Sequence, residues 1–128
     1  KAVVIGRSPV VGKPAAMMLL QKNATVTICH TKTTDMPSVV KEADIVIVAA
    51  GRAGVIDAKY LRAGQTIIDV GINVNEEGRL CGDVSFADAE PLVDAITPVP
   101  GGVGSVTTSV LVEHVVDAAL LKAGLDIL

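Results

Sequence analysis

The first residues of the chain combine glycine, arginine and serine at a spacing suited to phosphate binding. The apolar run Ala2–Ile5 ends at Gly6, and Gly12 and Pro14 follow before a helical stretch. A strand that passes through such a loop into a helix directs backbone N–H groups and the positive end of the helix dipole toward one point. The standard dinucleotide fingerprint is incomplete, because Ser8 stands where its second glycine would be. Taken alone, the stretch allows two interpretations, a phosphate loop or a strand-ending turn.

The residues after the second predicted strand, 25–29, indicate which nucleotide this loop would accept. A domain specific for NAD places Asp or Glu there to bind the ribose hydroxyls. This chain has His30 and Thr31 instead, with no acidic residue before Asp35. Arg7 in the first loop adds a guanidinium, and a cation with hydroxyls suits the 2′-phosphate of NADP. We therefore predict NADP rather than NAD, the alternative being that Arg7 and Lys32 are only solvated.

A second unusual stretch, residues 98–104, reads Pro-Val-Pro-Gly-Gly-Val-Gly and precedes a helix predicted to begin at Ser105 or Val106. The two prolines stiffen the approach, and the three glycines permit close backbone approach or positive φ angles. A purely structural turn seldom needs three glycines in four positions. We therefore predict a second binding loop for an anion or an oxygen-rich ligand, on the same edge as the first.

Other polar residues give weaker signals. His30 has no evident nucleophile or acid beside it, so local packing or hydrogen bonding is favoured over general-base catalysis. Asp69 lies in an apolar strand and is expected to accept hydrogen bonds, whereas Asn73 fits a cap or a ligand contact equally well. Cys29 and Cys81 lack a C-x-x-C pattern, so we predict no metal site and reduced thiols in a cytoplasmic protein.

These loops must be held by alternating strands and helices. Strands are predicted at residues 2–5, 25–29, 45–50, 66–70 and 95–97, the third central and the last at an edge, with helices between them and a small hairpin near 75–83. The last helix is predicted to run to about residue 123, with one apolar side formed by Leu111, Val112, Val115, Val116, Ala118 and Ala119. Such alternation implies parallel strands with right-handed crossovers. The predicted fold class is α/β, a Rossmann-type doubly wound, mostly parallel sheet with helices on both faces, which binds ligands at the carboxyl ends of its strands.

Composition sets the outer limits. The chain has 128 residues, half of them hydrophobic, and only Tyr60 and Phe86 are aromatic, which suits one domain with a helix-covered parallel sheet. No apolar run approaches the roughly 20 residues of a membrane span, so we expect no membrane partner. The net charge of −3 argues against nucleic acid. Residues 1–62 carry nine Lys/Arg against four Asp/Glu, as an anionic ligand near the first loop would require, although an uneven solvated surface explains this equally well.

With these residues assembled, the chain resembles the NAD(P)-binding domain of the bifunctional methylenetetrahydrofolate dehydrogenase/methenyltetrahydrofolate cyclohydrolase family. The motifs span nearly the whole chain, and the proline–glycine stretch together with the Gly-Arg-Ser loop is highly specific. In chain order they are Val4-Ile-Gly-Arg-Ser-Pro-Val-Val-Gly-Lys-Pro14, Ala24-Thr-Val-Thr-Ile-Cys-His-Thr31, Ala43-Asp-Ile-Val-Ile47, Ile68-Asp-Val-Gly-Ile-Asn73, Gly82-Asp-Val84 and Thr97-Pro-Val-Pro-Gly-Gly-Val-Gly104.

The resemblance implies an enzyme of one-carbon folate metabolism that oxidises methylenetetrahydrofolate with NADP and hydrolyses the methenyl product to formyltetrahydrofolate. Carried over by position, the cofactor would be held by Gly6, Arg7, Ser8, Thr31 and Ile72. The cleft shared with the folate substrate would be lined by Pro98, Pro100, Gly101, Gly102, Gly104 and Thr107. The chain departs from the family where Ser105 and Val106 replace a frequent Pro-Met, and Thr31 replaces a frequent serine.

The same resemblance assigns no catalytic residue to this chain. The family's catalytic Tyr-x-x-x-Lys and its folate pocket belong to an N-terminal domain, and that motif does not occur here. The chain also starts inside a predicted strand, so we expect residues 1–128 to be the cofactor domain of a longer enzyme that forms a homodimer. The rival interpretation is a regulatory nucleotide-sensing module of Rossmann type. It would favour an acidic residue after the second strand and no proline–glycine loop, and the sequence meets neither condition.

Overall fold

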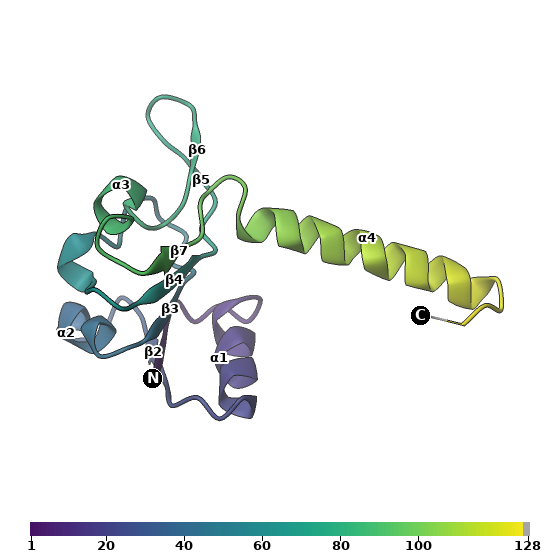
Figure 1. Ribbon diagram of the computed structural model, residues 1–128, viewed down its shortest axis with the longest axis horizontal. Helices are drawn as coiled ribbons and strands as arrows, with labels where there is room; N and C mark the ends of the chain where they lie inside the picture. Colours follow the sequence, from purple (N-terminus) through teal and green to yellow (C-terminus); the bar gives the residue numbers. More distant parts are fainter. Residues whose placement is uncertain (127–128) are drawn as a thin grey trace.

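The computed structural model describes residues 1–126 and shows strands alternating with helices along the chain (Figure 1). The elements are, in order, β1 (Ala2–Ile5), α1 (Gly12–Gln21), β2 (Val26–Cys29), α2 (Met36–Lys41), β3 (Ile45–Val48), η1 (Ala58–Tyr60), β4 (Thr66–Asp69), β5 (Asn73–Val74), β6 (Leu80–Cys81), α3 (Phe86–Ala89), β7 (Ala95–Ile96) and α4 (Val103–Lys122). Two helices begin earlier than predicted. α1 starts at Gly12, which leaves Pro14 in the first turn, where a missing N–H costs no hydrogen bond, and α4 starts at Val103.

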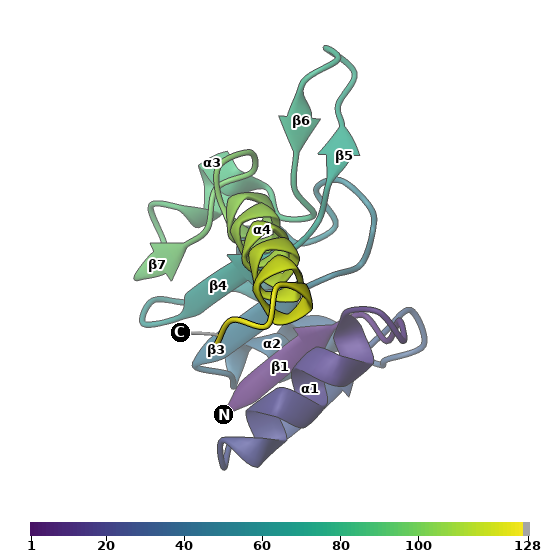
Figure 2. The ribbon, with the colours of Figure 1, turned by 90° about the vertical axis from the view of Figure 1, so that its right-hand side faces the viewer.

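Five strands form one parallel sheet in the order β2-β1-β3-β4-β7. The register aligns the ends of neighbouring strands, since Ile5 pairs with Cys29 on one side and with Val48 on the other. β3 is central and β7 lies at an edge, as predicted. β5 and β6 form a separate antiparallel hairpin that projects from the body (Figures 1 and 2). The predicted Rossmann-type α/β fold is confirmed.

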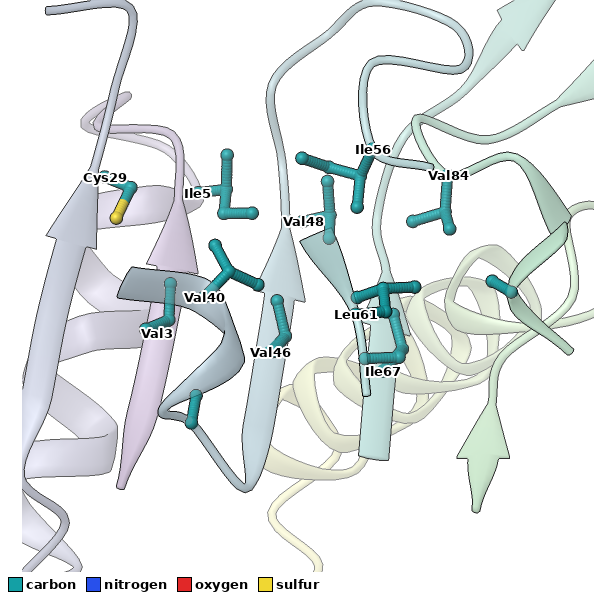
Figure 3. Packing of buried hydrophobic residues seen from close by; sticks show 12 residues of the cluster. Val3, Ile5, Cys29, Val40, Val46, Val48, Ile56, Leu61, Ile67 and Val84 are labelled. Carbon is teal, nitrogen blue, oxygen red and sulfur yellow. The ribbon is translucent and has the colours of Figure 1, made fainter. Parts of the chain in front are cut away.

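Helices cover both faces of the sheet. α1 lies on one face and α2 on the other (Figure 2). The α2 face carries the larger apolar core, built from β-branched and small side chains because the chain has so few aromatic residues (Figure 3). Its buried members are Val3, Ile5, Cys29, Val40, Ala43, Val46, Val48, Ile56, Leu61, Ile67, Val84 and Ala89. Burial of these side chains stabilises the sheet, and the register of the strand pairs sets which strand ends meet at the edge.

The other face of the sheet is covered less completely. Val4, Ala16 and Ile47 form its small buried core under α1, while Ile68 and Val70 are only partly buried. α1 packs on β1 and β2, and α4 departs on the same side of the sheet (Figures 1 and 2). The β4 part of this face is therefore left half open.

α4 does not pack on the domain. The helix extends away from it (Figure 1), and Leu111, Val112, Val115 and Val116, predicted to share one apolar side, are all exposed. The helix is also long and apolar enough to cross a membrane by length and composition alone, with no part of its most apolar stretch buried. The run-based prediction missed this because Glu113 and a few other polar residues interrupt the apolar sequence. One such helix is weak evidence for a membrane span, since soluble core helices share these properties.

Candidate functional site

The site begins where β1, β2 and β3 end. Because Ile5, Cys29 and Val48 lie abreast, the residues that follow these three strands leave the sheet along one edge. The chain runs from β1 to β2 on one side and then crosses to β3 on the other. The gap between β1 and β3 is thus the point where the strand order reverses, which is the usual ligand position in open α/β sheets.

The first loop needs glycine at two positions. Gly6 has φ of +122°, and a Cβ there would collide with the carbonyl oxygen of Ala49. A Cβ at Gly12 would collide in turn with the Gly6 carbonyl. The two glycines let β1, the start of α1 and the exit of β3 approach one another closely. The loop therefore packs closely at the switch point, which favours a binding loop over a simple strand-ending turn.

Ser8 caps the start of α1. Its Oγ accepts hydrogen bonds from the backbone N–H of Val11 at 3.0 Å and of Gly12 at 3.4 Å, and its carbonyl accepts from Lys13 N–H at 3.0 Å. The expectation that the first N–H groups of this helix point at a phosphate therefore needs correction, because Ser8 engages those of Gly12 and Lys13 as well as that of Val11 just before the helix. The Ser8 hydroxyl proton remains able to donate to a ligand.

A pocket of about 520 Å³ opens beside this loop, within the size range of small-molecule sites. It brings together Gly6, Arg7, Ser8 and Thr31, four of the five residues predicted to hold the cofactor. Within the described chain, its lining contains no Asp or Glu. The other lining residues are Ile5, His30, Met36, Ala49, Ala50, Arg52, Val55 and Tyr60. A cationic rim over apolar walls suits a ligand that joins a phosphate to a flat ring.

His30 is held by local hydrogen bonds, as predicted. Its Nδ1 accepts from the backbone N–H of Lys32 at 3.2 Å, and its own N–H donates to Thr33 Oγ1 at 2.9 Å. The preceding residue, Cys29, is buried, and burial raises the pKa of its thiol while a hydrogen bond with Thr33 partly lowers it. The thiol therefore stays protonated at neutral pH and acts as core packing.

Asp83 holds the far wall of this pocket. One of its oxygens, Oδ2, accepts hydrogen bonds from the N–H of Ala50 at 2.6 Å and of Gly51 at 2.8 Å. The other, Oδ1, accepts from Asn73 Nδ2 at 2.9 Å. The side chain is completely buried. A carboxylate distant in sequence thus fixes the backbone that leaves β3, and the Asn73 side chain serves this contact.

Asp69 holds Asp83 in place. Its oxygens accept from the N–H of Gly71 at 2.9 Å, Asp83 at 3.0 Å and Val84 at 2.9 Å, which confirms the predicted role of hydrogen-bond acceptor. Its own backbone N–H donates to Thr97 Oγ1 at 2.9 Å. Burial raises the pKa of the Asp69 carboxyl, the three N–H donors oppose that rise, and the charge of Asp83 adds to it.

A second pocket, of about 240 Å³, lies at the exit of β4. It gathers the predicted Ile72 with all five prolines and glycines predicted for the substrate cleft, Pro98, Pro100, Gly101, Gly102 and Gly104. Thr107, predicted for the same cleft, does not line this pocket, whereas Thr108 does. Both hydroxyls donate to the carbonyl four residues earlier, Thr107 to Val103 and Thr108 to Gly104, each at 3.1 Å. Asp69 also lines this pocket and accepts from the N–H of Asp83, the residue that anchors the wall of the first pocket.

Sequence reasoning missed two residues of this arrangement. The only sequence feature that pointed to Asp83 was its Gly-Asp-Val motif. The neighbouring residues do not reveal that its hydrogen-bond partners are Ala50 and Gly51. Arg52 carried the signal of a cation in a glycine-rich loop after the central strand. The two pockets and their shared edge define the class of protein: a Rossmann-type nucleotide-binding domain with a second ligand pocket beside the first.

Comparison with known proteins gives the family. Residues 1–123 match the family model of the tetrahydrofolate dehydrogenase/cyclohydrolase NAD(P)-binding domain, and the chain belongs to this family. It is 57% identical over 127 residues to the bifunctional protein FolD of Carboxydothermus hydrogenoformans, covering 98% of this chain and 44% of that protein. The chain therefore spans less than half the length of this relative. Family membership supports the enzyme interpretation over a regulatory nucleotide-sensing module.

Solved structures of enzymes in this family have the same fold as this chain. The bifunctional FolD enzyme of Campylobacter jejuni, a methylenetetrahydrofolate dehydrogenase/cyclohydrolase, superposes with a TM-score of 0.89 at 44% identity, covering 94% of this chain and 43% of that one. The methylenetetrahydrofolate dehydrogenase-cyclohydrolase of Trypanosoma brucei, solved with NADP and an inhibitor, gives a TM-score of 0.77 at 41% identity, covering 84% of this chain and 39% of that one.

Removing the Asp83 carboxylate should loosen the pocket wall. Asp83→Ala leaves three donors without their acceptor in a buried place and should lower the free energy of unfolding by about 3 kcal/mol or more. Asp83→Asn should cost less, because one amide oxygen can still accept from Ala50 and Gly51. Urea unfolding measures both, with Asp88→Ala at an exposed site as the control, expected within about 0.5 kcal/mol of the parent chain. Equal stability of Asp83→Ala and Asp88→Ala would contradict this role.

Asp69 should give the fold a specific dependence on pH. Its pKa is raised above 3.8 in the folded chain, so the folded state binds this proton more tightly than the unfolded state. The stability it contributes is present below pH 3.8 and is lost as the pH rises through the raised pKa. Asp69→Asn removes this component. Urea unfolding across this range should show the parent chain's advantage over Asp69→Asn shrinking as pH rises, and a widening advantage would show that the three N–H donors outweigh burial.

Proposed function

We propose that the chain is the NADP-binding domain of a bifunctional enzyme of one-carbon folate metabolism. The whole enzyme would transfer hydride from methylenetetrahydrofolate to NADP and then hydrolyse the methenyl product to formyltetrahydrofolate. The observation that carries the proposal is the acid-free pocket at the switch point, in which Arg7, Ser8 and Thr31 surround one space. The relative from Trypanosoma brucei, which was solved with NADP, supports the same cofactor here.

In this proposal the cofactor lies across the two pockets. Its adenosine end occupies the larger pocket, where Gly6 and Ser8 hold the phosphates and Arg7 and Thr31 face the 2′-phosphate. Its nicotinamide end extends toward the smaller pocket and lies against Ile72. The two pockets open along one edge of the sheet, because every strand that leads into them is parallel. The 70% exposed side chain of Ile72 offers an apolar surface for the ring.

The folate substrate would bind between this domain and a second one. Pro98, Pro100 and the glycines after them offer a wall with little side-chain bulk, so the reacting ring of the substrate can approach the nicotinamide closely. The acid–base residues for both reactions would come from the other domain, and this chain supplies none. The relatives are more than twice as long as the matched segment, so we assign the exposed apolar α4 to contact with that further domain.

We further propose a cytoplasmic homodimer without nucleic-acid or membrane partners. The net charge of −3 opposes binding to polyanions. Contact of α4 with the separate folate-binding domain would account for its apolar surface without a membrane. The β5–β6 hairpin supports self-association, because it is a two-stranded sheet with open edges and exposes Val74 and Leu80.

The cofactor proposal predicts binding without turnover. Residues 1–128 should bind NADP more tightly than NAD, and Arg7→Gln should weaken NADP about tenfold or more, because a charge-assisted hydrogen bond to phosphate is lost. Isothermal titration calorimetry measures both nucleotides, with Arg79→Gln on the exposed hairpin as the control. Equal affinity for NAD and NADP, or dehydrogenase activity of this chain by itself, would overturn the proposal.

The dimer proposal predicts that the mass of the protein in solution is that of a dimer and that substitutions in the β5–β6 hairpin lower it. Sedimentation equilibrium should give twice the chain mass of 13.1 kDa for the parent chain. A double variant, Val74→Lys with Leu80→Lys, should shift the population toward monomer, because it places like charges on a surface that would have to pair with its own copy. The control is Val106→Lys on α4, which is equally apolar and exposed but lies on another surface. A monomeric parent chain would refute dimerisation through this domain.

A further inference from the structure

The arginines of the chain divide into two pairs. Arg62 contacts Asp44 at 3.2 Å, and Arg79 contacts Glu77 at 3.5 Å, so each of these has a carboxylate partner. Within residues 1–126, neither Arg7 nor Arg52 is in an ion pair. Both of these arginines line the larger pocket, whose walls contain no carboxylate among the described residues. Two guanidinium groups without a protein counter-charge in one pocket indicate an anionic ligand with more than one negative charge.

The fold places the two cations on neighbouring strand exits. Arg7 follows β1 and Arg52 follows β3, which pairs with β1 on the side opposite β2. Thr31 follows β2 on the other side of β1. The backbone before Arg52 is anchored, because Asp83 holds the N–H groups of both Ala50 and Gly51. Arg52 therefore starts from a fixed point on the pocket wall that faces the β1 loop.

The charge of the expected ligand exceeds what Arg7 can neutralise alone. A phosphate monoester carries about −1.5 to −2 at neutral pH. His30 Nδ1 accepts a hydrogen bond from the Lys32 N–H, so this atom is already engaged within the chain. We propose that Arg52 is the second cation for the 2′-phosphate of NADP and so determines specificity together with Arg7. This inference rests on the proposed function and adds to it a residue that the sequence pattern did not single out.

Two other contacts would leave a different signature. An Arg52 that stacked on the adenine or reached the pyrophosphate would act on groups that NAD and NADP share. An Arg52 that pointed only to solvent would affect neither nucleotide. Because NAD lacks the 2′-phosphate, the ratio of the two affinities distinguishes these cases from the proposal.

The test compares Arg52 variants by calorimetric titration with NADP and NAD. Arg52→Gln should weaken NADP about tenfold or more and leave NAD within about twofold, while Arg52→Lys should fall between Arg52→Gln and the parent chain because it keeps the charge but not the two-pronged geometry. Arg79→Gln is the matched control and should change neither affinity. Thermal unfolding of each variant confirms that the fold is intact.

The same titrations separate this inference from the proposed function. A parent chain that binds NADP tightly, with Arg52→Gln weakening both nucleotides equally or neither, would overturn the role of Arg52 and leave the cofactor assignment standing. A parent chain that does not prefer NADP would overturn the cofactor assignment itself. Titration with adenosine 2′,5′-bisphosphate should repeat the tenfold loss in Arg52→Gln, because this probe carries the 2′-phosphate without the nicotinamide half. An unchanged affinity for the probe would also contradict the proposal.

Discussion

Two buried carboxylates, Asp69 and Asp83, hold the loops at the carboxyl ends of β3 and β4 in place through hydrogen bonds. The Asp69 carboxylate accepts from the N–H of Gly71 and from the N–H groups of Asp83 and Val84, and the Asp83 carboxylate accepts from the exit of β3 and from Asn73. Each side chain accepts three hydrogen bonds from N–H groups, which offset the cost of burying its charge. Gly71 and Gly82 lie so close to these carboxylates that a Cβ at either would collide with them. The shapes of both pockets depend on this pair.

The arrangement also keeps the buried carboxylates apart from the arginines of the larger pocket. Both buried carboxylates direct their oxygens at backbone and amide N–H groups of the chain, and within the described residues none lines the larger pocket. Among the described residues, the guanidinium groups of Arg7 and Arg52 therefore have no carboxylate that competes with a ligand. An anion in such a place meets cations, hydroxyls and apolar walls without a competing carboxylate, and the low dielectric of a partly enclosed pocket strengthens each contact.

One face of the domain is only partly covered within this chain. The core under α2 is continuous, but the face under α1 is only partly buried, and α4 leaves on that side with its aliphatic residues exposed. A helix of 20 residues gains most of its stability from packing an apolar face. The relatives are more than twice as long as this chain, and a second domain over the cleft would cover both the helix and the open face.

The sequence by itself determined the parallel sheet, its central β3, the glycine loop and the group of Arg7, Ser8 and Thr31, because each depends on local patterns and on the rule that parallel strands end together. Only the tertiary structure decided that Ser8 caps α1, that Asp83 anchors Ala50 and Gly51, that Arg52 joins Arg7, and that Thr108 replaces Thr107 in the second pocket. These contacts join residues far apart in the chain or depend on the direction of a side chain. No local propensity encodes such distances, so they follow from the register of the sheet and the packing around it.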